Sequence, residues 1–166
     1  MSPLPFRTGF AYDVHRFEEG RKLVLGGVEI PGAPGLAGHS DADCAAHAAA
    51  DAILGAAGLA DIGFHFPPGD PSCRDIDSRR ILAFAVREAR ESGYRIGNLD
   101  LMIVAERPRI GPWIDSMRER LGETLGIDGS RIGIKATTNE GLGAIGRGEG
   151  IAAMATVLLF SAEGGD

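Results

Sequence analysis

Two histidines and an aspartate in this sequence have the types and spacing that bind a metal ion. Residues 6–15 alternate between two sets of side chains, which indicates a strand, and Asp13 and His15 then lie on one face about 7 Å apart. His47 lies in an alanine-rich stretch that favours a helix. Two imidazoles and one carboxylate suit zinc or another divalent ion and leave a coordination position open for a substrate. A salt-bridged Asp13 beside two buried histidines fits the same residues, so both interpretations stay open.

The alanine-rich helix has recognisable end signals. Alanine is the best helix former, so residues 41–54 are predicted to be helical. Ser40 can cap the start, with Asp43 as the acidic half of a capping box. Gly55 or Gly58 can end the helix, because glycine readily adopts the left-handed conformation of a C-cap. A helix with so few large side chains is expected to lie in the interior.

This helix is predicted to present a polar stripe. Asp43, His47 and Asp51 are four residues apart and share one helix face. Asp51 could accept the second ring N–H of His47 and orient the ring, although a plain surface acid is an equal interpretation. Asp43 is assigned to helix capping. His39 precedes the cap, at the positive end of the helix dipole, which suits a phosphate better than a cation.

Three loops carry further polar groups. In residues 135–140, threonine hydroxyls and backbone N–H groups at a strand end suit phosphate oxygens, and Glu140 could hold Mg²⁺. Arg147 could bind an anion or pair with a neighbouring acid, yet an ordinary glycine-rich turn explains residues 141–150 better. Residues 61–70 could line a polyol pocket, and residues 106–111 place two arginines around a proline. A structural loop and solvated surface charge are at least as good readings of these last two.

Strand and helix patterns alternate along one continuous chain, which predicts an α/β or α+β domain with a mixed sheet over residues 1–166. The Gly-Gly break within residues 22–30 favours a hairpin. Residues 61–75 are predicted to be a loop, because prolines and glycines interrupt them. The other predicted strands span residues 6–15, 95–105, 131–138 and 151–160, and the other predicted helices span residues 77–92 and 112–125.

Composition excludes several classes of protein. A net charge of −6 argues against a nucleic-acid-binding surface. No apolar run approaches the roughly 20 residues of a membrane span, and the start lacks the pattern of a signal peptide. We therefore expect a cytoplasmic protein with neither nucleic acid nor membrane as partner. Cys44 and Cys73 are expected to be reduced thiols rather than a disulfide.

Eight motifs, in this order, are similar to those of the 2-C-methyl-D-erythritol 2,4-cyclodiphosphate synthase family. The similarity runs from Gly9 to about Phe160, and the motifs are specific jointly rather than singly. They are Y-D-V-H-R-F (12–17), L-G-G-V-x-I-P (25–31), H-S-D-x-D (39–43), H-x-x-x-D-A-x-L-G-A (47–56), D-I-G (61–63), F-P-x-x-D-P (66–71), K-A-T-T-x-E (135–140) and G-R-G-E-G (146–150).

The resemblance implies an α+β sandwich with a mixed four-stranded sheet, a small hairpin and helices on one face. The sheets would pack around the threefold axis of a homotrimer, with active sites between subunits. Asp13, His15 and His47 would be the zinc ligands. His39 and Thr138 would stabilise the transition state as catalytic residues.

The resemblance also implies a substrate site and further ligands. A second ion, Mg²⁺ or Mn²⁺, would accompany the substrate diphosphate near Glu140, and an isoprenoid diphosphate could lie on the axis near Arg147. The implied substrate contacts are Asp13, Val14, His15, His39, Ser40, Asp61, Ile62, Gly63, Phe66, Pro67, Pro68, Gly69, Asp70, Ala105, Arg109, Ile110, Gly111, Thr137, Thr138, Asn139, Glu140, Ala144 and Arg147.

Three positions depart from the family pattern. Pro68 stands where an acid is common, which removes a side chain and an N–H donor. Ala144 replaces a frequent aromatic, which weakens the case for an isoprenoid ligand. Arg109 replaces a frequent lysine, which keeps the charge with another geometry.

The implied reaction converts 4-diphosphocytidyl-2-C-methyl-D-erythritol 2-phosphate into a cyclic diphosphate and CMP. Two alternatives are a zinc-dependent phosphohydrolase with the same ligands and a non-catalytic trimer that binds isoprenoid diphosphates.

Overall fold

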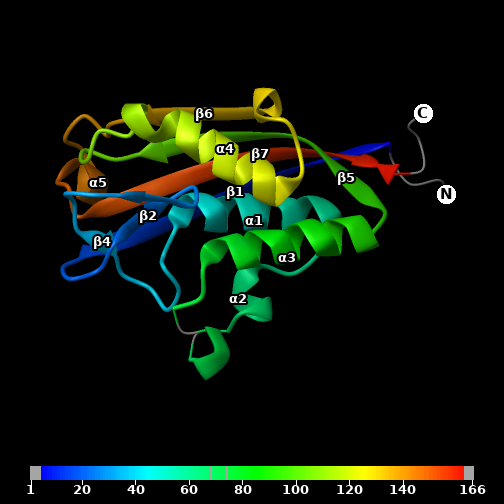
Figure 1. The fold of residues 1–166 in the computed structure, drawn as a ribbon, viewed down its shortest axis with the longest axis horizontal. Helices are drawn as coiled ribbons and strands as arrows, with labels where there is room; N and C mark the ends of the chain where they lie inside the picture. Colours follow the sequence, from blue (N-terminus) through cyan, green and yellow to red (C-terminus); the bar gives the residue numbers. More distant parts are fainter. Residues whose placement is uncertain (1–4, 68, 74, 163–166) are drawn as a thin grey trace.

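A five-stranded sheet forms the frame of the molecule (Figure 1). The computed structural model describes residues 5–67, 69–73 and 75–162. The strands lie in the order β4-β1-β7-β5-β6; β5 and β6 are parallel, and the other neighbours are antiparallel. Four strands occur where the sequence predicts them, and the structure adds the two-residue β4. Their bounds are Phe6–Glu18 (β1), Gly35–Leu36 (β4), Tyr94–Val104 (β5), Ile132–Thr137 (β6) and Gly150–Ser161 (β7).

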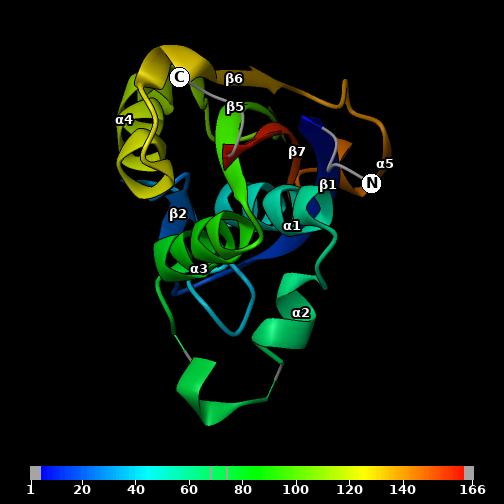
Figure 2. The same cartoon turned by 90° about the vertical axis from the view of Figure 1, so that its right-hand side faces the viewer.

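Helices cover one face of this sheet, as Figure 2 shows in end view. The central helix α1 packs across β1 and β7 and beside α3, while α4 packs near β6. The longer helices are Cys44–Ala57 (α1), Ser78–Glu91 (α3) and Ile114–Leu125 (α4). Among the described residues, none of the helices combines the length and apolar character that a membrane span needs.

The start of α1 differs from the prediction. Its N-cap is Asp43, whose side chain accepts the N–H groups of Ala45 and Ala46, and not Ser40. The helix then continues through Gly55 and ends at Gly58, which has a φ of 79°. A carboxylate at position 43 satisfies two open N–H groups at once, so the helix begins three residues later than predicted.

Two predicted loops contain short helices. Residues 61–75 include α2 (Ile62–His65) and a 3-10 turn at Pro71–Cys73, and the glycine-rich turn includes α5 (Gly143–Gly146). Asp61 caps α2 by accepting the N–H of Phe64, so one turn forms despite the nearby prolines. Two further 3-10 turns lie at Gly111–Trp113 and Gly129–Arg131.

The predicted hairpin is present and is tied to α1. Strands β2 (Leu23–Leu25) and β3 (Val28–Ile30) are joined by Gly26 and Gly27, with φ of 56° and 74°. Such a two-residue turn needs positive φ at both positions. The buried carboxylate of Asp43 accepts both glycine N–H groups, at 2.9 and 2.7 Å. One side chain therefore joins the hairpin turn to the first turn of α1.

We expect Asp43→Asn to destabilise the fold by about 1–3 kcal/mol, because the new amide group would face a backbone N–H and leave it unpaired. The loss of free energy should appear as a lower denaturant midpoint. Asp77→Asn is the matched control: Asp77 caps α3 from a half-exposed position, and asparagine caps as well as aspartate. Equal effects of the two substitutions would contradict the role of Asp43.

Candidate metal centre and active site

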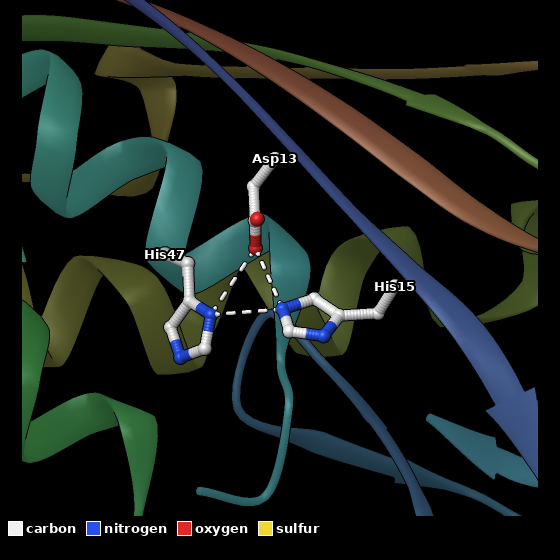
Figure 3. Close-up of side chains that lie close together, drawn as sticks. All are labelled: Asp13, His15 and His47. Carbon is white, nitrogen blue, oxygen red and sulfur yellow. Dashed lines mark hydrogen bonds and ion pairs between the residues drawn. The ribbon is translucent and has the colours of Figure 1, made fainter. Parts of the chain in front are cut away.

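Asp13, His15 and His47 converge on one point (Figure 3). Asp13 and His15 project from the same face of β1 toward α1, and His47 lies in the first turn of α1. Asp13 Oδ2 lies 3.0 Å from His15 Nε2 and 3.1 Å from His47 Nδ1, and the two ring nitrogens are 3.3 Å apart. Three donor atoms of these types at these distances can hold one divalent ion.

The ring of His15 has a defined tautomer. Its Nδ1 lies 2.6 Å from the carbonyl oxygen of Ala37, which can only accept a hydrogen bond, so Nδ1 carries a proton. Nε2 is then the nitrogen that faces Asp13 and His47. Two ring nitrogens and a carboxylate oxygen repel one another at this range unless a cation or a proton lies among them. The donor set therefore fits a metal ion.

The pKa values of the two β1 residues move in opposite directions. Burial tends to raise the pKa of Asp13, but hydrogen bonds and charge from His15 and His47 outweigh burial and hold it well below its usual range. Burial tends to lower the pKa of His15, but the hydrogen bond and charge of Asp13 raise it above 6.5 overall. In the metal-free chain, the Asp13 carboxylate therefore favours the protonated form of His15.

Asp51 does not orient His47, which was one of its two equal interpretations, and it is not a plain surface acid either. Its Oδ1 accepts the backbone N–H of Ile62 at 2.7 Å and so fixes the start of α2. The second nitrogen of His47, Nε2, instead lies 2.9 Å from Ser78 Oγ and 3.2 Å from Ser40 Oγ. Ser78 was not among the predicted site residues, because the sequence marks it only as an early residue of a helix.

The metal centre opens on a cavity of about 220 Å³. Several residues predicted to bind substrate line this cavity beside the three candidate ligands: His39, Ser40, Ile62, Gly63 and Phe66. A neighbouring cavity of about 420 Å³ is lined by His39, Gly69 and Asp70 together with Arg21. Pro68 lies outside the described residues. Several of the residues predicted to bind substrate thus lie together beside the three candidate ligands.

The predicted phosphate-binding residues at the end of β6 lie across the sheet from the metal centre. The register leads from Asp13 on β1 to Ala153 on β7. It continues to Ile103 on β5 and then to Ala136 on β6, the residue before Thr137. Three strand spacings separate Asp13 from this position, about 14 Å. The segment that follows contains the remaining phosphate candidates, Thr138, Asn139 and Glu140. Thr138 thus follows a strand three positions away from β1, while His39 lines the cavity at the metal centre.

The segment 106–111, with its two arginines around a proline, lies beside this second group. The N–H of Asn139 donates to Glu106 Oε1 at 2.7 Å, which ties the end of β6 to the loop that begins after Ala105. Arg107 and Pro108 of this loop line a separate cavity of about 400 Å³ with Phe17 and Gly148. Three positions predicted to bind substrate follow at Arg109, Ile110 and Gly111.

An α+β domain with an open two-histidine, one-carboxylate centre falls in the class of metal-binding enzymes. Residues 6–160 match the YgbB family, and the chain belongs to that family. The chain is 57% identical over 159 residues to the 2-C-methyl-D-erythritol 2,4-cyclodiphosphate synthase of Moorella thermoacetica, covering 96% of this chain and 98% of the relative.

Two further relatives carry the same name. The synthase of Akkermansia muciniphila is 59% identical over 157 residues, which are 94% of this chain and 93% of the relative. A solved structure of such a synthase with bound CDP superposes with a TM-score of 0.85 at 39% identity, over 92% of this chain and 99% of that one.

Proposed function

We propose that this chain converts 4-diphosphocytidyl-2-C-methyl-D-erythritol 2-phosphate into 2-C-methyl-D-erythritol 2,4-cyclodiphosphate and CMP, a step of the non-mevalonate isoprenoid pathway. The observation that carries the proposal is the centre of Asp13, His15 and His47, which opens on a cavity. The near full-length relatives named for this synthase, one of them solved with CDP, support the substrate. The reaction makes the chain a phosphorus–oxygen lyase.

In this reaction an oxygen of the 2-phosphate attacks the β-phosphorus, and the bond from that phosphorus to the CMP phosphate breaks. The attacking oxygen is already an anion, so no strong general base is required. Binding both ends of a folded substrate is the main task of the protein, because orientation removes much of the entropic barrier. His39 and Ser40 line the metal-side cavity and can hold one end. The cavity must exclude water, since hydrolysis would compete.

A divalent ion at the centre, zinc by its donor set, would supply Lewis-acid activation and positioning of the phosphates. The chain provides Asp13, His15 and His47 as its ligands. Thr138 donates to Glu140 Oε1 at 3.1 Å, so a hydroxyl and a carboxylate lie together at the end of β6. We assign Glu140 to a second ion, Mg²⁺ or Mn²⁺, on the diphosphate, and His39 and Thr138 to transition-state stabilisation.

We further propose that the working form is a homotrimer. The sheet face away from the helices exposes a row of apolar side chains on β1, with exposed fractions of 60% at Phe6, 67% at Phe10 and 52% at Tyr12. A row of this kind favours burial against other copies. Assembly of three copies around a threefold axis would place Thr138 of one copy next to His39 of another. Arg147, which pairs with Glu149 at 2.6 Å, would lie near the axis and could contact an isoprenoid diphosphate.

A site shared between copies predicts complementation. His47→Ala and Thr138→Ala should each be inactive alone. Refolding equal amounts together should restore about a quarter of the wild-type activity, because about one site in four combines two intact halves. Product formation before and after mixing measures this, and light scattering should report three times 17.4 kDa. Mixed samples that stay inactive would place the whole site within one chain.

The raised pKa of His15 predicts a pH-dependent metal affinity. A metal ion must displace the proton on His15. Because the pKa of His15 is raised above 6.5, metal affinity should fall as the pH decreases through that pKa. Calorimetry in buffers of different ionisation enthalpy should detect more protons released at about pH 6 than at about pH 8. Equal proton release at the two pH values would contradict the assignment of His15 as a ligand.

Incubation of the metal-loaded protein with the cytidyl substrate tests the proposed function. A cyclic diphosphate and CMP in equal amounts are the expected products. An open phosphate that contains oxygen from labelled water would instead identify a phosphohydrolase. Tight binding of isoprenoid diphosphates without any turnover would identify a binding protein.

A further inference from the structure

The ring of His47 has a second, buried nitrogen that does not face the metal centre. Nε2 lies 2.9 Å from Ser78 Oγ at the start of α3, and both side chains are buried. Ser78 Oγ is also hydrogen-bonded to Asp41 Oδ1, across the junction between α1 and α3. Figure 3 shows Nε2 on the side of the ring away from Asp13 and His15.

The proton positions in this chain of groups follow from the number of donors. The carboxylate of Asp41 can only accept, and it also receives the N–H of Ser78 at 3.1 Å and the N–H of Asp43 at 3.2 Å. The single hydroxyl proton of Ser78 must therefore point to Asp41. Ser78 Oγ then presents only lone pairs to His47, so Nε2 must carry the ring proton.

We propose that Ser78 and Asp41 are positioning residues that hold His47 in its metal-binding tautomer. With the proton on Nε2, the lone pair of Nδ1 points at Asp13 and His15, where the ion is proposed to bind. Without this restraint the ring could instead carry its proton on Nδ1 and donate it to Asp13 Oδ2, 3.1 Å away. A metal ion would then have to displace that proton, at a cost in affinity.

Ser40 is a weaker partner for the same nitrogen. Its Oγ lies 3.2 Å from Nε2 and already accepts the N–H of Ala42 at 3.0 Å. No carboxylate fixes its hydroxyl proton among the described contacts, and it lines the substrate cavity. Ser40 can therefore serve the substrate while Ser78 and Asp41 fix the ring.

The test compares Ser78→Ala with Ser78→Thr, which keeps the hydroxyl. Nitrogen-15 chemical shifts of His47 in the metal-free protein, at a pH where the ring is neutral, report the tautomer. Wild type and Ser78→Thr should show the proton on Nε2, and Ser78→Ala should show it moved toward Nδ1. Titration with Co²⁺, followed by its absorption spectrum, should give an affinity about 10- to 100-fold lower for Ser78→Ala.

Two results would overturn the inference. One is Ser78→Ala with an unchanged tautomer and an affinity within about twofold of wild type. The other is a Co²⁺ affinity of Ser78→Thr as low as that of Ser78→Ala, because the loss would then come from altered packing and not from the missing hydroxyl. If Ser78→Ala fails to fold, Asp41→Asn replaces it in both measurements. An unchanged His47 tautomer together with an unchanged Co²⁺ affinity in Asp41→Asn would also overturn the inference. The inference rests on the proposed metal centre. Wild-type protein that carries the His47 proton on Nε2 and binds Co²⁺, but forms no product, would refute only the proposed function.

Discussion

His47→Ala is expected to abolish metal binding and CMP release while the fold is retained. The substitution removes one of three donor atoms that lie within 4.8 Å of one another, and the remaining carboxylate and imidazole make a poor site for a divalent ion. We expect metal affinity to fall by at least about a hundredfold and product formation to fall to background. Metal analysis of the purified protein and a CMP assay measure the two effects.

Two further variants make this result specific. Asp13→Asn keeps the shape of the side chain but removes its charge, so it should lose metal without leaving a cavity. His65→Phe is the control: His65 packs against Phe64 and Phe84 with ring centroids at 5.2 and 4.8 Å, and its Nε2 has no hydrogen-bond partner within the described structure. We expect its metal content and activity to match wild type. Full activity in His47→Ala would refute the metal assignment.

Gly9→Ala, which adds a single methyl group, is expected to cause a large loss of stability. A Cβ at Gly9 would lie 1.9 Å from the carbonyl oxygen of Ala52 and 2.9 Å from the Cβ of Ala56. Both partners belong to α1, so the helix would have to move away from β1. Forced expansion of a packed core commonly costs up to about 3 kcal/mol, and a backbone clash of this size should reach or exceed that value.

Gly55→Ala is the matched control on the same helix. A Cβ there would meet nothing within 4 Å, and the position is exposed and helical. Alanine should therefore stabilise the protein by about 0.5–1 kcal/mol. Denaturant midpoints of both variants, measured at one protein concentration, test the pair. An unchanged midpoint for Gly9→Ala would mean that α1 does not approach β1 this closely.

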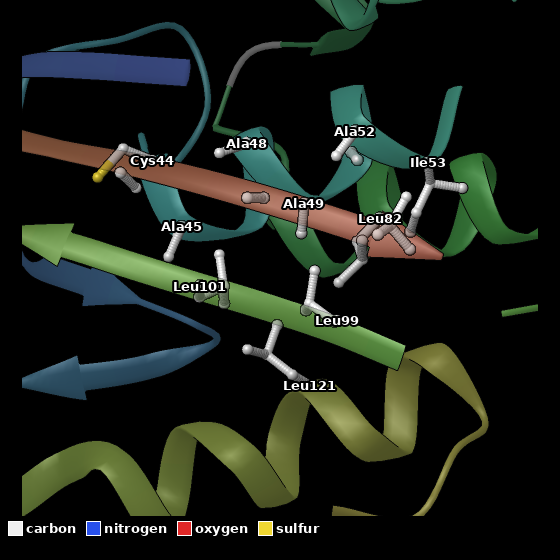
Figure 4. Close-up of a cluster of buried hydrophobic side chains, with 14 of the residues drawn as sticks. Cys44, Ala45, Ala48, Ala49, Ala52, Ile53, Leu82, Leu99, Leu101 and Leu121 are labelled. Carbon is white, nitrogen blue, oxygen red and sulfur yellow. The ribbon is translucent and has the colours of Figure 1, made fainter. Parts of the chain in front are cut away.

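The close approach of α1 explains why its alanines matter to the site. In Figure 4 the labelled alanines of α1 extend short side chains, while Leu82, Leu99 and Leu101 enter the core from α3 and β5. Small residues let the helix axis lie near the sheet, which brings His47 within reach of β1. A larger residue at one of these buried positions would push α1 away from the sheet. It would therefore move His47 away from Asp13 and His15 and also disturb the core packing.

Local pattern was sufficient for part of the site. Alternation along β1 correctly placed Asp13 and His15 on one face, because successive strand residues point to opposite sides whatever the rest of the chain does. Alanine content predicted the helix of His47, and the Gly-Gly pair predicted the hairpin, since both depend on backbone preferences of a few neighbouring residues.

Contacts between distant residues were decided by the tertiary structure alone. The sequence suggested Asp51 as the partner of His47, because four residues make one helical turn, yet α2 takes the carboxylate of Asp51 and α3 supplies Ser78 to His47. The start of α1 likewise depends on where Asp43 meets the hairpin turn. A side chain with several possible partners chooses among them by packing, and packing joins segments that no local pattern relates.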